Sequence, residues 1–268
     1  MSKKILVLLL SLSLLLSMAA CAQEKAPATD GTGEPTKATE ASDPPPEPVQ
    51  EATTAATETT APAETENQTA EDLYLEKYVP VLDRYSQALQ EQWNEGMLFQ
   101  EGMCTFSTYC YEGNPLENVG YALMDLSGDH VPELLVGATG GDAYVQDVLF
   151  EVYTLQNDVP VQLLVSNERS SYRLCDDDGG CYFLVNQASV SAAQREWLYF
   201  IITDDQLAVM QGVVYDAAAD PENPWFMTYD DDWDTSNDTA IDEATAKAIM
   251  DGYEARCFVP EYTLFAAR

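Results

Sequence analysis

The sequence predicts an α+β fold, in which an antiparallel β-meander lies between an N-terminal helix and a C-terminal helix. Apolar residues recur at helical spacing near residue 80 and again near residue 250. Between them, short β-branched and aromatic runs alternate with turn clusters such as SGDH, TGGD and DDDGG. The runs follow one another without helical patterns in between, which favours antiparallel pairing over βαβ units.

The two helices are predicted from apolar stripes. The first stripe consists of Leu75, Tyr78, Leu82, Tyr85, Leu89 and Trp93. Because proline fits the first turn of a helix better than its interior, we expect this helix to begin at Pro80 and to end near Trp93. The second stripe follows Asp242, a favourable N-cap, and consists of Ala246, Ile249, Met250 and Tyr253. Both stripes are expected to pack on the core.

Seven runs are expected to be strands of the meander. They are Tyr121–Met124, Leu134–Ala138, Val148–Leu155, Val159–Val165, Tyr182–Val185, Leu198–Ile202 and Leu207–Tyr215. The segment FVPEYTLF is expected to return as an edge strand, since an edge tolerates Pro260.

The first 20 residues have the three parts of an export signal. Lys3 and Lys4 precede an apolar run over residues 5–16, and small residues stand directly before Cys21. We therefore expect residues 1–20 to be a lipoprotein signal peptide and Cys21 to carry fatty acids such as palmitate, because two or more acyl chains anchor a protein stably. The expected location is the extracytoplasmic face of the cell membrane. The alternative is an ordinary secretion signal that happens to end on a cysteine.

The composition changes abruptly after Cys21. Residues 22–70 are mostly Thr, Ala, Glu and Pro, with no aromatic residue and a single aliphatic residue larger than alanine, Val49. Such a segment buries too little apolar surface to offset its chain entropy. We expect residues 21–70 to be the lipidated cysteine and a disordered tether, and residues 71–268 to form one extracytoplasmic domain.

The chain is strongly acidic, with a formal net charge of −34 at pH 7. A surface of this sign repels nucleic acid and anionic lipid headgroups, so no nucleic-acid partner is expected. An acidic, soluble cell-surface protein is a simpler interpretation than a protein with a specific cationic partner.

Five cysteines remain besides Cys21, and an odd number leaves at least one thiol unpaired. They are Cys104, Cys110, Cys175, Cys181 and Cys257. If Cys175 and Cys181 flank a hairpin, they could face each other across two strands. Their spacing does not fit a zinc ribbon, so structural or unpaired cysteines are favoured. The sequence leaves the pairing open.

The segment MDLSGDHVPE predicts a cation site. Asp125, Ser127, Asp129 and Glu133 supply side-chain oxygens at loop positions 1, 3, 5 and 9, and Val131 offers its carbonyl at position 7. Six to eight oxygens at about 2.3–2.6 Å are what calcium takes. The alternative is a metal-free turn in which the acidic side chains cap their own backbone.

This loop resembles the short D-x-D-G-D-x-x-x-E calcium loop of FG-GAP, or integrin-like, repeats, and the wider string resembles that of uncharacterised bacterial surface lipoproteins. The resemblance covers about a dozen residues in one copy, and it implies calcium as a structural ligand. Ser127 replaces an aspartate of the pattern, and His130 replaces a glycine that takes the left-handed conformation.

A second acidic cluster, DDDWDTSNDTAIDE, partly fits an EF-hand loop counted from Asp232, but Thr239 stands where an apolar β-branched residue is expected. A solvated acidic loop before the helix capped by Asp242 is favoured.

Catalytic motifs are not evident. His130 is the only histidine, and the sequence shows no nucleophile elbow, HExxH motif or phosphate loop. We expect a non-catalytic binding or interaction domain, with carbohydrate or peptide as the candidate ligand classes. Trp225, Phe226 and Trp233 could form a stacking platform, although loop packing is the commoner role. The alternative is a secreted carboxylate-dependent hydrolase of glycosidase type, which would need an aromatic-walled cleft holding two carboxylates.

Overall fold

A computed structural model describes residues 69–177 and 179–268, which belong to one compact unit. The predicted signal peptide, Cys21 and nearly all of the predicted tether lie outside the described residues. The α-helices are α2 (Ala70–Gln90), α3 (Glu95–Gln100), α4 (Pro115–Asn118) and α5 (Glu243–Glu254). Short 3₁₀ turns are η2 (Thr105–Cys110), η3 (Ala143–Val145), η4 (Thr235–Asn237) and η5 (Phe265–Ala267).

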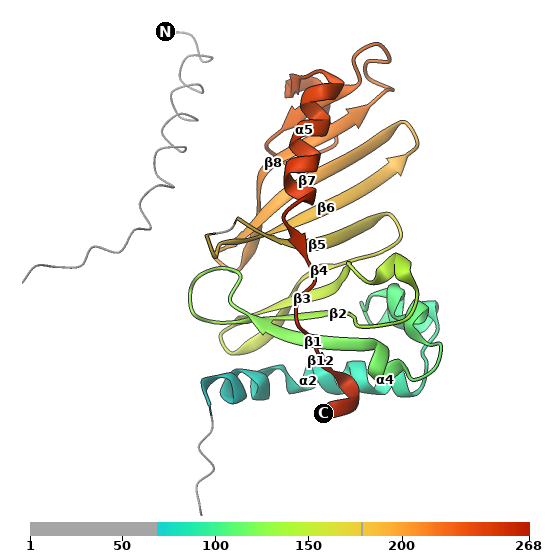
Figure 1. Cartoon of the computed structure of the whole chain (residues 1–268), viewed down its shortest axis with the longest axis vertical. Coiled ribbons are helices and arrows are strands. Elements are labelled where there is room, and N and C mark those ends of the chain that lie inside the picture. The colour runs from blue at the N-terminus through green and yellow to red at the C-terminus, as the bar shows by residue number, and fades with distance from the viewer. Residues whose placement is uncertain (1–68, 178) are drawn as a thin grey trace, which may run out of the picture. The chain divides into compact units, whose positions relative to one another are not determined.

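The centre of the fold is a 12-stranded antiparallel sheet with the order β10-β9-β8-β7-β6-β5-β3-β2-β1-β12 (Figure 1). Two strands lie off this path, since β4 pairs with β3 and β11 pairs with β5. The strands are β1 (Val119–Met124), β2 (Glu133–Ala138), β3 (Leu149–Gln156), β4 (Val159–Val165), β5 (Ser170–Asp176), β6 (Tyr182–Ser191), β7 (Gln194–Thr203), β8 (Gln206–Asp216), β9 (Trp225–Thr228), β10 (Thr239–Ala240), β11 (Cys257–Phe258) and β12 (Thr263–Leu264). The predicted antiparallel meander is thus confirmed.

All seven predicted strands overlap observed strands, and three strands, β5, β9 and the two-residue β10, were not predicted. β5 has a polar face, and β9 has only four residues, so neither gives a strong apolar signal. The expected edge strand at the FVPEYTLF segment is divided into β11 and β12, of which β12 pairs with β1.

Helix α2 begins ten residues before the predicted start. A capping box explains this start, because the Thr69 hydroxyl accepts from the Asp72 N–H while the Asp72 carboxylate accepts from the Thr69 N–H. Pro80 therefore lies inside the helix and not in its first turn. Burial of Tyr78, Leu82 and Tyr85 on either side of Pro80 outweighs the loss of one backbone hydrogen bond.

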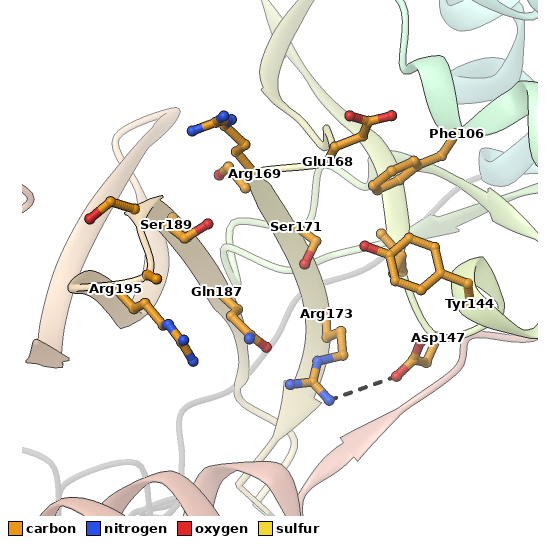
Figure 2. Close-up of a pocket in the computed structure, with 15 residues that line it drawn as sticks. Phe106, Tyr144, Asp147, Glu168, Arg169, Ser171, Arg173, Gln187, Ser189 and Arg195 are labelled. Atoms are coloured by element: carbon orange, nitrogen blue, oxygen red, sulfur yellow. Dashed lines mark ion pairs between the residues drawn. The ribbon is translucent and has the colours of Figure 1, made fainter. Parts of the chain in front are cut away.

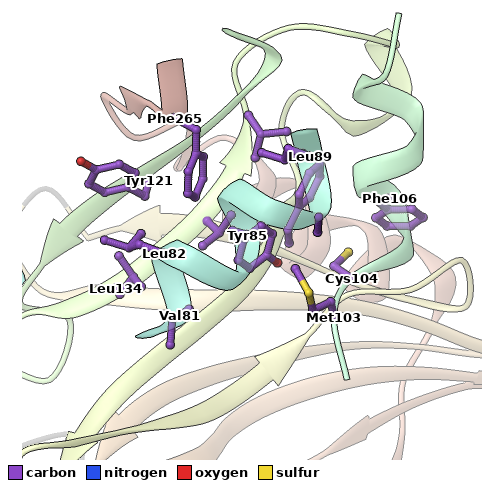
Figure 3. Close-up of a cluster of buried hydrophobic side chains, with 14 of the residues drawn as sticks. Val81, Leu82, Tyr85, Leu89, Met103, Cys104, Phe106, Tyr121, Leu134 and Phe265 are labelled. Carbon is purple, nitrogen blue, oxygen red and sulfur yellow. The ribbon is translucent and has the colours of Figure 1, made fainter. Parts of the chain in front are cut away.

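The core beneath α2 joins the helix to one face of β1–β3. Leu82, Tyr85 and Leu89 point from the helix towards these strands, and Phe265 lies beside them (Figure 3). Tyr85 stacks on Phe265 with a centroid distance of 5.7 Å. Residues close to the C-terminal end of the described chain therefore help to complete the first core.

A buried carboxylate, Glu151 of β3, also ties α2 to the sheet. It accepts hydrogen bonds from the hydroxyls of Tyr85 and Tyr153, from the Cys104 N–H at 2.7 Å and from the Gln162 side-chain amide at 2.6 Å. Burial raises the pKa of Glu151, and these hydrogen bonds oppose the rise. Four donors around one carboxylate are a network whose loss would leave several buried polar groups unpaired.

A second core takes leucines from β2, β3, β5, β6 and β7, namely Leu135, Leu149, Leu174, Leu184 and Leu198. The opposite face of β5–β7 is covered by α5, whose Ile249 and Tyr253 pack against Phe183, Val185 and Tyr199. Asp242 caps α5 as predicted, since its carboxylate accepts from the Thr245 N–H at 2.7 Å.

The disulfide of the structure joins Cys175 of β5 to Cys257 of β11, which follows α5. The hypothesis that Cys175 faces Cys181 is wrong. The β5–β6 hairpin does form, but its register places Cys175 opposite Phe183, while Cys181 lies in the loop. Cys104 and Cys110 are buried free thiols, and Cys181 is an exposed one.

Candidate functional site

One face of β5–β7 changes character along its length. Under α5 the side chains are apolar, but farther along the same strands they are polar. Because side chains alternate along a strand and directly paired residues share a face, Ser171 and Arg173 of β5 lie on the same face as Gln187 of β6 and Arg195 of β7. Pairing of Ser171 with Gln187, and of Ser189 with Arg195, places these polar groups side by side.

The polar part of this face is the floor of a cavity of about 500 Å³, which we call the arginine cleft. Arg169, Arg173 and Arg195 line it, three of the six arginines in the whole sequence. In Figure 2, Ser171, Gln187 and Arg173 lie between Arg195 on one side and Tyr144 on the other. The cleft therefore gathers half of the arginines of a chain whose formal net charge is −34.

The three arginines differ in how they are held. Arg173 forms ion pairs with Glu254 of α5 and, at 3.7 Å, with Asp147, so its position is fixed. Arg169 donates to the Val190 carbonyl at 3.0 Å. The exposed Arg195 has no ion-pair or hydrogen-bond partner among residues 69–177 and 179–268. An exposed guanidinium without a partner is available to bind a carboxylate or phosphate in a bidentate manner.

The wall of the cleft that lies across from Arg195 is aromatic. Phe106 lies 5.9 Å from Tyr144 and 6.0 Å from Tyr109, measured between ring centroids. Phe106 is buried, whereas Tyr144 remains 60% exposed. Phe106 thus supports Tyr144 from behind, and the tyrosine ring offers a flat face to a ligand.

The chemistry of the cleft is that of a binding site for a small, polar anion. Guanidinium groups attract negative charge, while serine hydroxyls and the Gln187 amide can donate and accept hydrogen bonds. Two carboxylates, Asp147 and Glu168, also line the cleft. Asp147 forms an ion pair with Arg173. Its role is therefore better explained as holding that arginine in place than as a free acid or base.

The loop predicted to bind calcium joins β1 to β2, and its side chains bond to its own backbone. The Asp125 carboxylate accepts from the N–H groups of Gly128 at 2.7 Å and His130 at 2.9 Å. The Asp129 carboxylate accepts from the Val131 N–H at 2.7 Å, and the Ser127 hydroxyl from the Asp129 N–H at 3.4 Å. His130 adopts a φ of 72°, the left-handed conformation that glycine has in the pattern the loop resembles.

Glu133 stands apart from the rest of this loop because it is buried, with 1% of its surface exposed. It accepts from the Leu126 N–H at 2.8 Å and from the Thr154 hydroxyl at 3.3 Å. Burial, together with the charge of Asp129, raises the pKa of Glu133 to about 7. Within the described residues, no group of three or more His, Cys, Asp or Glu side chains is arranged to hold a metal ion.

The second acidic cluster has the geometry of a solvated, self-capped loop. Asp232 accepts from the Asp234 N–H at 2.8 Å, and Asp234 from the Ser236 N–H at 3.0 Å. Strand β9 precedes it, where an EF-hand would have a helix.

Trp225 and Phe226 belong to strand β9, although the sequence suggested a loop. The arginine cleft itself was missed, since Arg169, Arg173 and Arg195 are scattered in the sequence and meet only through strand pairing. The available signal was the concentration of rare basic residues between positions 169 and 195 of an acidic chain.

Comparisons of this chain with known protein families, with curated proteins and with solved structures give no match. Among the helices of the described residues, none combines the length and the apolar character needed to cross a membrane.

Proposed function

We propose that this protein is a lipid-anchored, extracytoplasmic binding protein whose domain captures a small anionic ligand in the arginine cleft without catalysing a reaction. The observation that carries this proposal is the arrangement of Arg169, Arg173 and Arg195 around one cavity. Arg173 is positioned by two acidic neighbours, while Arg195 is free of partners among the described residues.

The charge of the chain limits the size of the ligand. Long-range repulsion from a net charge of −34 disfavours polyanions such as nucleic acid. A small anion experiences less of this repulsion, because at physiological salt the charges more than about 8 Å away from it are largely screened. The cleft would therefore select small ligands with one or two negative charges.

The anchoring part of the proposal rests on the sequence. Residues 1–20 act as a lipoprotein signal peptide, Cys21 carries the lipid, and the segment from Cys21 up to Thr69, the cap of α2, is a disordered tether. The domain from residue 71 onwards is α+β, with α2 before the sheet and α5 near its end. This arrangement holds the cleft away from the membrane surface and exposes it to extracellular ligands.

We also propose that the β1–β2 loop binds calcium, in line with its resemblance to the FG-GAP loop. Asp125, Ser127, Asp129 and Glu133 would supply side-chain oxygens and Val131 its carbonyl. The support is chemical, since the buried Glu133 lies close enough to Asp129 for their charges to interact, and a cation would neutralise both. The ion would stabilise the hairpin and take no part in ligand binding.

The test of the arginine cleft is calorimetric titration of the purified protein with glucuronate, citrate and phosphate, each beside a neutral analogue. We expect at least one of these anions to bind and Arg195→Gln to weaken it about tenfold or more, the usual loss for a hydrogen bond to a charged group. Lys247→Gln is the matched control, because it removes one positive charge from α5, outside the cleft.

The proposal is wrong if none of the anions binds, or if Arg195→Gln and the parent bind equally well. Release of a hydrolysed product during incubation with a glycoside, lost in Asp147→Asn or Glu168→Gln, would instead support the carboxylate-dependent hydrolase.

A further inference from the structure

The face that forms the floor of the cleft continues across the sheet. Ser189 pairs with Arg195, Arg195 with Tyr215, and Tyr215 with Trp225. Directly paired residues share a face, so these four side chains form one row across β6, β7, β8 and β9. With strands about 4.8 Å apart, the row extends over about 14 Å.

The far half of this row is aromatic. The ring of Trp225 lies 4.9 Å from that of Tyr215 and 6.1 Å from that of Trp197, measured between centroids. Trp197 pairs in turn with Gln187, which lines the cleft. All three rings are partly exposed. We call Trp197, Tyr215 and Trp225 the aromatic strip.

The combination of groups favours a sugar over a peptide. The C–H face of a pyranose ring carries partial positive charge and stacks on the negative face of an aromatic ring. Around the cleft, Ser171, Gln187 and Ser189 offer neutral hydroxyl and amide groups that match sugar hydroxyls. A peptide would instead require apolar sockets for its side chains, and the floor of the cleft is formed by serine, glutamine and arginine.

We propose that the ligand is an acidic oligosaccharide. A ring bearing a carboxylate occupies the arginine cleft, with its charge on Arg195, and the next, neutral ring lies on Trp225 and Tyr215. The row of about 14 Å, three strand spacings, accommodates at least two such rings. This inference rests on the proposed function, because it requires the cleft to bind an anion, and it adds the chemical class and the second subsite.

The experiment compares glucuronate with three disaccharides in which glucuronic acid is joined to glucose, galactose or N-acetylglucosamine, each beside its neutral counterpart. Binding to the purified protein is measured by calorimetry and by tryptophan fluorescence. At least one acidic disaccharide should bind about fivefold or more tightly than glucuronate, since tryptophan and tyrosine residues that anchor a ligand cost more than about 1 kcal/mol when truncated. The neutral counterpart should bind about tenfold or more weakly.

Two variants separate the subsites. Trp225→Leu should remove the advantage of the disaccharide while leaving glucuronate binding unchanged, and Arg195→Gln should remove the preference for the acidic sugar. Trp93→Phe, on a tryptophan outside the aromatic strip, is the control. Thermal melts of each variant verify folding, and Trp225→Phe, which keeps a ring at this position, should retain part of the advantage if Trp225→Leu does not fold.

Glucuronate binding without a gain for any disaccharide, or with Trp225→Leu behaving as the parent, overturns this inference and leaves the anion-binding proposal intact. Binding of neither glucuronate nor any acidic disaccharide overturns the inference, and the anion-binding proposal then depends on citrate and phosphate. Tighter binding of triglutamate than of every acidic disaccharide overturns it in favour of an acidic peptide.

Discussion

The carboxylate of Glu196 makes a quantitative prediction about stability and pH. Glu196 lies in β7 between Arg195 and Trp197, and its side chain points to the opposite face of the sheet. It is 5% exposed, and one of its oxygens has no hydrogen-bond partner among the described residues. Burial, and secondarily the charge of Asp231, raises its pKa from 4.5 to about 7.

The sign and size of the effect follow from this pKa. Because the folded state binds the proton more tightly than the unfolded state, Glu196 favours folding below about pH 4.5, and this advantage is lost as pH rises through about 7. At 1.36 kcal/mol for each pKa unit, the loss is about 3 kcal/mol by pH 8. In Glu196→Gln the side chain stays neutral at every pH, so this loss should disappear.

Urea denaturation of the parent and of Glu196→Gln at pH 5, 6, 7 and 8 measures the difference. We expect similar free energies of unfolding at pH 5 and a variant more stable by about 2–4 kcal/mol at pH 8. Glu222→Gln, at an exposed loop position, should follow the parent. Burial also raises the pKa of Glu133 and Glu151, so both proteins retain some pH dependence, and only their difference reports on Glu196. Identical pH dependence in the two proteins would refute the reasoning.

Four further predictions concern other parts of the chain. Millimolar calcium should raise the Tm of the parent by about 5–10 °C over its value in EGTA, because an ion at a hundredfold excess over its Kd adds about 2.7 kcal/mol to the free energy of unfolding. Asp129→Ala should abolish this shift, whereas Asp232→Ala should keep it. An equal shift in Asp129→Ala would place the site elsewhere. Cys21→Ser should move the protein from the membrane fraction to the soluble fraction, whereas continued lipid labelling of that variant would contradict anchoring at Cys21. Limited proteolysis should leave a resistant fragment that begins close to Thr69, the cap of α2, and protection within residues 30–60 would count against a disordered tether. Tyr85→Phe should lower the free energy of unfolding by about 1–3 kcal/mol, because it removes one of the donors to buried Glu151. Tyr144→Phe, at an exposed ring, is the control. Equal stabilities of Tyr85→Phe and the parent would contradict a role for the network.

The meander could be predicted because most of its strands bury at least one face. β2 and β3 are buried along all or nearly all of their length and are rich in apolar residues, and their positions were found to within one or two residues. β5 was missed for the opposite reason, since Ser171 and Arg173 face an open cleft and interrupt the apolar signal. The cleft proposed to bind the ligand thus lies where the apolar periodicity of the strands is weakest.

Residues that meet only through tertiary pairing could not be found from spacing along the chain. Cys175 and Cys257 are 82 residues apart and become neighbours because β11 returns to pair with β5. The start of α2 shows a different limit. The prediction relied on the poor fit of proline to a helix interior, whereas the helix begins at the Thr69–Asp72 capping box and continues through Pro80.

The position of Phe265 in the first core constrains the order in which the domain can fold. Phe265 packs against Tyr85 and Tyr121, and Arg268 contacts Ser86 across a sequence separation of 182 residues. The pocket beneath α2 cannot close until residues 263–265 have emerged and β12 has paired with β1. Contacts of such long range form slowly, because loop closure precedes the gain in contacts. During synthesis the core beneath α2 would therefore remain open until residues 263–265 have left the ribosome, so the domain would close late and not progressively from its N-terminal end.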